Sequence, residues 1–269
     1  MRALAPGPAY LFCPADRPDR YAKAASAADV VILDLEDAVA AEAKEQARNW
    51  VRQSTLDPVR TVVRVNSVTS EHFDDDVAML RESTFRTVML AKTASAEHVR
   101  ELADFKVVAL IETAAGVLAA EAIAACPNTL GLMWGSEDLV ATLGGTSSHF
   151  GDGSYRDVAR HARAHTLICA GAYERLAIDA VCLEIADVEA QRARAQDASA
   201  MGFSASACIH PNQVAVIRES YRPTADQLAW AQSVVDAAQG RAGVFRLGTL
   251  MVDGPVIAQA QAILNRAIQ

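Results

Sequence analysis

The stretch VVILDLEDAV, residues 30–39, begins as an apolar run and ends in charged side chains. Consecutive apolar residues are typical of a parallel strand that is buried on both faces. Asp34 and Glu36 stand two residues apart at the end of this run, so strand alternation places their side chains on one face. The stretch therefore predicts a parallel sheet with acidic groups at the carboxyl ends of its strands.

Short apolar runs of this kind recur along the chain, with helix-length segments between them. Eight runs are predicted as strands, the number that closes a (β/α)8 TIM barrel. The alternative, an open doubly wound sheet, usually has a G-x-G-x-x-G turn after its first strand, and none follows here. The predicted strands are 9–13, 30–35, 61–66, 87–91, 107–111, 130–134, 179–183 and 206–209. The predicted helices include 42–53, 95–103, 116–125, 154–176 and 188–201.

The alternation of strands and helices ends after Pro211. A helix is predicted over 224–239, followed by a turn-rich link over 240–248 and a final helix over 256–267. This tail is too short for a second domain. We therefore expect an α/β barrel domain over residues 1–222 and a short helical C-terminal extension, or lid, over residues 223–269.

The composition of the chain restricts its class of function. Of 269 residues, 51% are hydrophobic, which excludes a disordered chain. The formal net charge of -8 makes binding to nucleic acid or to an anionic membrane surface unfavourable. From the sequence we expect no signal peptide, and no apolar run in it is long enough to span a membrane. Five cysteines without a CxxC motif favour buried thiols in a reducing cytoplasm.

Charged side chains stand at the ends of several predicted strands, where a barrel of this kind has its active site. Carboxylates gathered there repel each other unless a cation lies among them. Because the candidate ligands are oxygen atoms, we predict Mg2+, with Mn2+ as a substitute. His161 and His165 are four residues apart, but without an HExxH motif we interpret them as a surface pair. The strand-end residues are Asp34, Glu36, Asp37, Arg64, Lys92, Glu112, Glu137, Asp138 and His210.

Several of these residues also have a purely structural interpretation. Asp34 and Asp37 could cap the helix that follows them. Arg64 could belong to a buried ion pair, and Lys92 could be a solvated loop residue.

A basic group lies near the N-terminus, in FCPADRPDRYAKA. Arg17, Arg20 and Lys23 cluster at a predicted helix N-terminus, where backbone N–H groups favour anions, so they could hold a phosphorylated cofactor. The alternative is a solvated helix face. The glycine-rich segment 144–157 matches no Walker motif and is either a loop over the site or a connector.

Nine motifs spread from residue 10 to residue 260 resemble, in their order, the citrate lyase β-subunit-like branch of the HpcH/HpaI aldolase superfamily. The resemblance implies a (β/α)8 barrel, Mg2+ and a CoA thioester substrate. The implied reaction is cleavage, or formation by condensation, of a 3-hydroxyacyl-CoA such as citramalyl-, malyl- or 3-hydroxy-3-methylglutaryl-CoA. The motifs are LFCPADRPDRYAKA, VVILDLEDAV, VRVN, VMLAK, ALIET, GLMWGSEDL, LAIDAV, GFSASACIHPNQV and TLMVDGPVI.

The resemblance also implies roles for individual residues. It implies metal binding by Glu112 and Asp138, and substrate binding and catalysis by Arg64. It implies acid/base catalysis by Asp253, on a C-terminal lid that is shared between the subunits of a homotrimer or a dimer of trimers. CoA contacts are implied for Phe12, Arg17 and Lys23, and supporting roles are expected for Asp34, Glu36, Asp37 and Lys92.

Three other functions stay open at the level of the sequence. Lys92 could form a Schiff base, as in a class I aldolase. The family often has proline before this lysine, whereas Ala91 stands here. The enzyme could be an aldolase that does not use CoA. It could also be the β subunit of a multi-subunit citrate lyase that acts on a carrier-bound citryl group.

Overall fold

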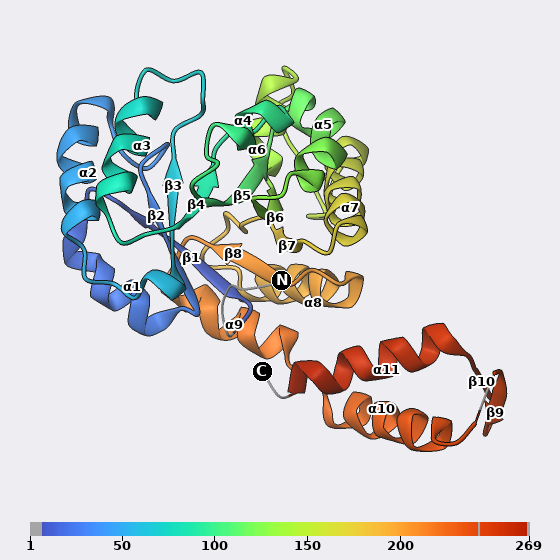
Figure 1. Cartoon of the computed structure of the whole chain (residues 1–269). Helices are drawn as coiled ribbons and strands as arrows, with labels where there is room; N and C mark the ends of the chain where they lie inside the picture. The colour runs from blue at the N-terminus through green and yellow to red at the C-terminus, as the bar shows by residue number, and fades with distance from the viewer. Residues whose placement is uncertain (1–6, 242, 268–269) are drawn as a thin grey trace. The chain divides into compact units, whose positions relative to one another are not determined.

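The computed structural model of the chain describes residues 7–241 and 243–267. These residues form two compact units, which divide between Ile217 and Arg218. The boundary expected from the sequence lies five residues later, between residues 222 and 223. The first unit contains the barrel, and the second contains the C-terminal helices (Figure 1).

Eight parallel strands of the described chain close into a barrel, in which each strand pairs with the next and β8 pairs with β1 (Figure 1). This confirms the expected (β/α)8 class over the doubly wound alternative. The strands are β1 (Ala9–Pro14), β2 (Val30–Asp34), β3 (Thr61–Val65), β4 (Thr87–Leu90), β5 (Lys106–Ile111), β6 (Thr129–Trp134), β7 (Leu176–Asp179) and β8 (Ala205–Cys208).

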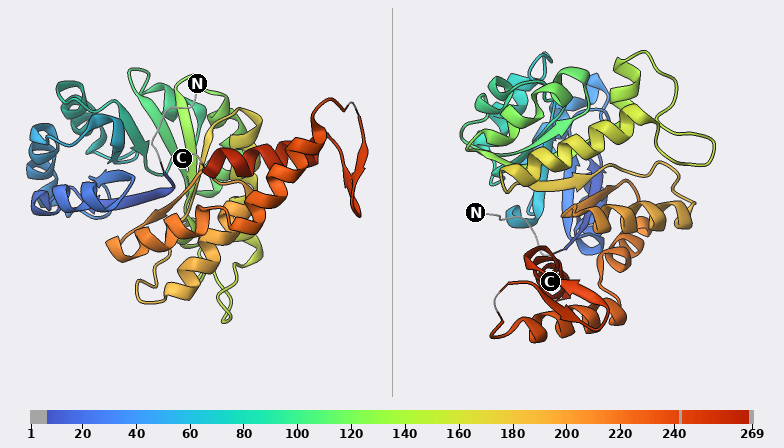
Figure 2. Two further views of the ribbon diagram at one scale, coloured as in Figure 1. Left: turned by 90° about the horizontal axis from the view of Figure 1, so that it is seen from below. Right: turned by 90° about the vertical axis from the view of Figure 1, so that its right-hand side faces the viewer.

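Helices lie outside the ring of strands (Figure 2). Local capping fixes where several of them begin: the Thr113 side chain accepts a hydrogen bond from the N–H of Gly116 at 3.0 Å, one turn into α5. The α-helices are α1 (Tyr21–Ala27), α2 (Lys44–Gln53), α3 (Phe73–Glu82), α4 (Ala96–Arg100), α5 (Ala114–Ala125), α6 (Ser136–Thr142), α7 (Asp157–Ala172), α8 (Val188–Met201) and α9 (Pro211–Tyr221). Three 3-10 turns add η1 (Pro18–Arg20), η2 (Ala41–Ala43) and η3 (Pro58–Arg60).

Apolar side chains from the strands fill the inside of the barrel. These residues recur at alternate strand positions, as the two-residue period of a strand requires. The barrel is therefore a packed core, and polar chemistry is confined to its ends. The core includes Tyr10, Ile32, Val62, Met89, Val108, Leu110, Met133, Ile178 and Ala207.

The position of the seventh strand differs from the sequence prediction. The strand runs over Leu176–Asp179, whereas 179–183 was predicted. The run LAIDAVCL is apolar on both sides of Asp179, so its pattern does not locate the strand. The Asp179 carboxylate accepts a hydrogen bond from Trp134 Nε1 at 2.6 Å and pairs with Arg163 at 2.9 Å. These contacts hold the strand end, and residues 180–183 leave the sheet.

The second unit is a pair of helices with a short hairpin between them. Its elements are α10 (Ala225–Ala238), β9 (Phe245–Leu247), β10 (Leu250–Val252) and α11 (Gly254–Ala267). A capping box between Thr224 and Gln227 starts α10. Its small core contains Ala231, Val234, Val252 and Ala260. The predicted turn-rich link at 240–248 includes β9, which pairs antiparallel with β10.

Within the described residues, we find no helix whose length and apolar character would allow it to cross a membrane.

Candidate active site at the carboxyl ends of the barrel strands

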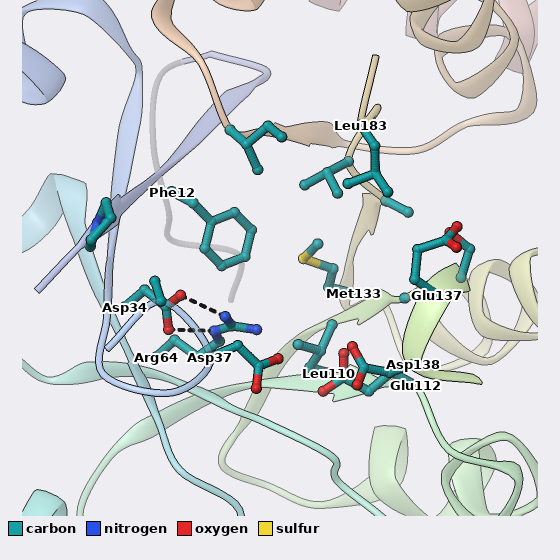
Figure 3. A pocket seen from close by; sticks show the side chains of 17 residues that line it. Phe12, Asp34, Asp37, Arg64, Leu110, Glu112, Met133, Glu137, Asp138 and Leu183 are labelled. Carbon is teal, nitrogen blue, oxygen red and sulfur yellow. Dashed lines mark hydrogen bonds and ion pairs between the residues drawn. The ribbon is translucent and has the colours of Figure 1, made fainter. Parts of the chain in front are cut away.

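A cavity of about 380 Å3 lies at the carboxyl ends of the strands (Figure 3). It brings together seven of the residues that the sequence singled out: Phe12, Asp34, Asp37, Arg64, Glu112, Glu137 and Asp138. The other lining residues are Pro14, Ala38, Leu110, Met133, Gly135, Ser136, Ala180, Val181, Leu183 and Ile209. One part of the wall is therefore charged and the rest is mostly apolar.

Arg64 on β3 is held from three sides. Asp34 accepts hydrogen bonds from its Nε at 2.7 Å and from its Nη2 at 2.6 Å. Glu36 pairs with Nη1 at 3.1 Å, and the Phe12 ring lies over the guanidinium, 5.0 Å from ring centroid to Cζ. A guanidinium has five N–H groups, so these three polar contacts leave one hydrogen on each Nη for a ligand. Arg64 thus belongs to a buried ion pair and also lines the cavity.

The electrostatics of Arg64 keep it charged. Its burial opposes the charge, but the Asp34 and Glu36 carboxylates outweigh that effect and raise its pKa further. A fixed cation with two free N–H groups can bind a carboxylate or stabilise an oxyanion.

Glu112 follows β5 directly and is 3% exposed. Its Oε1 accepts a hydrogen bond from the backbone N–H of Lys92 at 2.9 Å. Burial first, and then the neighbouring charge of Asp138, raise the pKa of Glu112 to about 8. A Cβ on Gly135 would lie 2.9 Å from Glu112 Oε2, so the carboxylate packs directly against a position where only glycine leaves room.

Asp138 lies in the first turn of α6 and is partly exposed. Its carboxylate and that of Glu112 line the same cavity (Figure 3). The described residues contain no group of three or more His, Cys, Asp or Glu side chains that could hold a metal ion. Mg2+ is commonly held by one or two carboxylates, with water and ligand oxygens in the other positions. The oxygen donors of Glu112 and Asp138 fit that ion.

Lys92 lies in the turn after β4, and its side chain reaches three carboxylates. Its Nζ contacts Glu36 closely and lies 3.5 Å from Asp37 Oδ1 and 3.7 Å from Asp138 Oδ1. Burial alone would lower the pKa of Lys92, but the hydrogen bond and charge of Glu36 outweigh burial and raise it. A Schiff-base lysine must lose its proton to act as a nucleophile, so this environment disfavours the class I alternative.

The cavity lining does not include Arg17 or Lys23. Both are exposed: Arg17 precedes η1 and pairs with Asp19 at 3.2 Å, and Lys23 lies on α1. The solvated-face alternative and the CoA role are both compatible with this placement, so the CoA contacts stay a prediction.

Asp253 lies in the second unit, immediately before α11. Its Oδ1 accepts a hydrogen bond from the N–H of Val256 at 3.2 Å, so it caps the helix. Its predicted acid/base role stays a prediction.

Glu137 is a cavity residue to which the sequence assigned no role. Its Oε1 accepts hydrogen bonds from Ser136 Oγ at 2.9 Å and from Ser148 Oγ at 2.6 Å. Ser148 belongs to the glycine-rich segment 144–157, and Tyr155 of that segment packs edge-on against Trp134 at 5.1 Å. The segment is therefore joined to the site by hydrogen bonding and packing. The only sequence signal for this was the acidic pair Glu137 and Asp138 after β6.

Comparison with known proteins shows which family this chain resembles. The model of the HpcH/HpaI aldolase/citrate lyase family matches residues 9–211. A citrate lyase subunit beta-like protein of Mycobacterium tuberculosis (strain H37Rv) is 52% identical over 99% of this chain and 98% of its own length. The mitochondrial citramalyl-CoA lyase of Homo sapiens is 30% identical over 89% of this chain and 78% of its own length.

The fold is also found in a solved structure, the crystal structure of CitE from Mycobacterium tuberculosis in complex with magnesium, acetoacetate and coenzyme A. The TM-score is 0.95 at 52% identity, and the match covers 98% of this chain and 98% of that one.

Proposed function

This chain belongs to the HpcH/HpaI aldolase/citrate lyase family, and we propose that it is a Mg2+-dependent carbon–carbon lyase with a CoA thioester substrate. Its substrate in this proposal is a 3-hydroxyacyl-CoA, which it cleaves to acetyl-CoA and an oxo acid or forms by the reverse condensation. The observation that carries the proposal is the meeting of Glu112 and Asp138 with Arg64 in one cavity. The related CitE structure with magnesium, acetoacetate and coenzyme A supports it.

The charge of the cavity supports the need for a metal ion. Among the described lining residues there are five carboxylates and a single cation, Arg64, which is already paired with Asp34 and Glu36. A CoA thioester of a hydroxy acid is itself strongly anionic. Lys92 lies beside this lining and pairs with Asp37 and Asp138, but Arg64 and Lys92 together do not balance five carboxylates. A further cation would therefore favour the binding of such a substrate.

Each group of the site has a distinct task in the proposed reaction. When bound between Glu112 and Asp138, Mg2+ would supply Lewis acidity toward the oxygens of the substrate. Arg64 donates its two remaining N–H groups to the oxyanion of the acyl part, a contribution often worth a few kcal/mol in the transition state. Asp34, Glu36 and the Phe12 ring hold the guanidinium in place for this contact.

The remaining steps involve residues outside the cavity. Asp253, delivered by a C-terminal lid of a neighbouring subunit in a homotrimer or dimer of trimers, protonates the enolate carbon of the acetyl-CoA product. Arg17 and Lys23 bind the phosphates of CoA.

The five buried thiols agree with a cytoplasmic location.

Three substrates remain within this proposal: citramalyl-CoA, malyl-CoA and 3-hydroxy-3-methylglutaryl-CoA. A second function, the β subunit of a multi-subunit citrate lyase, is favoured by the names of relatives such as the citrate lyase subunit beta of Escherichia coli, 31% identical over 89% of this chain. A protein that purifies without partner subunits and turns over free CoA thioesters would exclude that second function.

The experiment that tests the proposal is a panel of the three CoA thioesters, with acetyl-CoA and the oxo acid measured as products in Mg2+ and in EDTA. We expect cleavage of at least one thioester in Mg2+ and loss of cleavage in EDTA. Turnover that survives EDTA, with covalent trapping by borohydride at Lys92, would establish the Schiff-base mechanism instead. Turnover of hydroxy-oxo acids without CoA would establish the CoA-independent aldolase.

A further inference from the structure

Lys92 contacts both of the proposed metal ligands, through different parts of the residue. Its backbone N–H donates to Glu112 Oε1 at 2.9 Å, and its ammonium lies 3.7 Å from Asp138 Oδ1. The same ammonium pairs with Glu36 and Asp37, which follow β2. One lysine therefore joins carboxylates from the ends of β2 and β5 and the first turn of α6.

The backbone of Lys92 has an uncommon conformation for a residue other than glycine. Its φ is +49°, in the left-handed region, and among the described non-glycine residues only Lys92 and Glu174 have positive φ. Glycine or asparagine is favoured in such a turn, because a longer side chain is strained there. A lysine at this position is consistent with a side chain that is needed at the carboxylates.

We propose that the Lys92 ammonium is the resident counter-cation of this carboxylate cluster, holding Asp138 and Glu36 in place and opposing the binding of Mg2+ to the same cluster. This inference rests on the metal site of the proposed function. It makes Lys92 a positioning residue, and it explains how four carboxylates of one site can lie together in the metal-free protein.

The position of the Lys92 ammonium determines how strongly it would repel Mg2+ bound at Asp138. The Lys92 ammonium is fixed near Asp138 by its short contact with buried Glu36, and only 30% of its side chain is exposed. A cation bound to Asp138 would therefore lie close to a like charge, in a site that is only partly exposed to water. Removal of the ammonium should tighten Mg2+ binding, whereas a merely structural lysine would leave the affinity unchanged or weaken it when removed.

The test is isothermal titration of the metal-free full-length protein with MgCl2 alone, comparing wild type with Lys92→Met. The measurement is made at about pH 9, so that the protonation of Glu112 does not contribute. We expect the Kd for Mg2+ to fall by at least about tenfold in Lys92→Met. Lys92→Arg, which keeps the charge, should stay near wild type. Lys106→Met removes an exposed lysine at the amino end of β5 and is the matched control for lost net charge.

Thermal unfolding supplies a second readout. Metal-free Lys92→Met should have a lower Tm than wild type, because Asp138 loses its counter-charge and Glu36 keeps only Arg64. MgCl2 should raise the Tm of this variant by more than it raises that of wild type. If Lys92→Met does not fold, Lys92→Gln removes the same charge while keeping a polar side chain.

The outcomes separate the inference from the proposed function. If neither the wild type nor a folded Lys92→Met variant binds Mg2+ at millimolar concentration, the metal site is overturned and the inference with it. Mg2+ binding to wild type, with equal or weaker binding to a folded Lys92→Met or Lys92→Gln variant, would overturn the role of Lys92 alone.

Discussion

At the scale of single residues, the site holds a buried carboxylate whose proton is retained first because of burial and then because of a neighbouring carboxylate. This carboxylate is Glu112, which is buried beside Asp138 and whose pKa is raised from 4.5 to about 8. Its proton is held more tightly in the folded protein than in the unfolded chain. The stability of the metal-free protein is therefore linked to pH through this one group.

We expect the free energy of unfolding in EDTA to decrease as the pH rises from about 5 to about 8. The stabilising contribution of protonated Glu112 is fully present below about pH 4.5 and is lost as the pH rises through its folded-state pKa of about 8. One proton gives a slope of at most about 1.4 kcal/mol per pH unit. Denaturant unfolding at several pH values measures it, and Glu112→Gln should flatten the slope. The same slope in that variant would contradict the assignment.

A second residue-scale prediction concerns Gly135. A Cβ at this position would lie 2.9 Å from both Cβ and Oε2 of Glu112, so Gly135→Ala should displace the Glu112 carboxylate. We expect the Kd for Mg2+ to rise by about tenfold or more while the circular dichroism spectrum is unchanged. Gly151→Ala is the control, because nothing lies within 4 Å of its Cβ position. Equal Mg2+ affinity in the two variants would mean that Glu112 is not a ligand.

At the scale of elements, the end of β7 depends on a buried polar group that joins three elements. Asp179 accepts hydrogen bonds from Trp134 on β6 and from Arg163 on α7, whose side chain is 8% exposed. These partners are 45 and 16 residues away from Asp179 in the sequence. The strand end next to the cavity is thus fixed by long-range contacts.

Asp179→Ala should lower the free energy of unfolding by about 3–5 kcal/mol, because it leaves the Arg163 charge buried without its main partner. Asp197 is the other carboxylate that pairs with Arg163, and the Asp197 side chain is 59% exposed. Asp197→Ala should therefore lower the free energy of unfolding by at most about 1 kcal/mol. Denaturant unfolding of the two variants provides the comparison. Similar losses in both would show that burial of the pair is not what matters.

The contrast between β2 and β7 shows what the sequence could predict. In β2 the apolar run ends in several charged residues. The run itself predicted the strand, and strand alternation predicted that Asp34 and Glu36 lie on the same face. In β7 a lone Asp179 interrupts an apolar run, and the partners that end the strand there are distant in sequence. The left-handed turn at Lys92 was equally hidden, because the residues that Lys92 contacts, Glu36, Glu112 and Asp138, are distant from it in the sequence.

At the scale of the whole molecule, the barrel places its polar groups at one end by construction. Parallel strands have their carboxyl ends at the same end of the barrel. Arg64, near the end of β3, and Glu112, directly after β5, therefore lie at that end. The sequence order of strand-end residues was therefore enough to gather six of the cavity residues. Side-chain pairings, such as that of Glu137 with Ser148, depend on how loops fold back and could not be predicted in this way.

The lid is the part of the proposal that depends on more than one copy of the chain. Asp253 caps α11 through Val256, and Asp253→Asn keeps an oxygen that can accept this hydrogen bond while removing the proton-transfer group. We expect this variant to lose orders of magnitude in kcat with little change in Tm or in the KM for the CoA thioester. Circular dichroism and steady-state kinetics measure both effects.

Subunit mixing then tests whether Asp253 acts on a neighbouring barrel. Asp253→Asn and Glu112→Ala are each expected to be inactive, but a mixed oligomer would contain some sites with an intact barrel from one chain and an intact Asp253 from another. Partial activity should therefore return after exchange of subunits, which mass spectrometry of differently labelled chains can verify. Verified exchange without any recovery would mean that Asp253 serves the barrel of its own chain or none. Near-normal kcat of Asp253→Asn alone would remove Asp253 from the mechanism, because no proton-transfer group would then be missing.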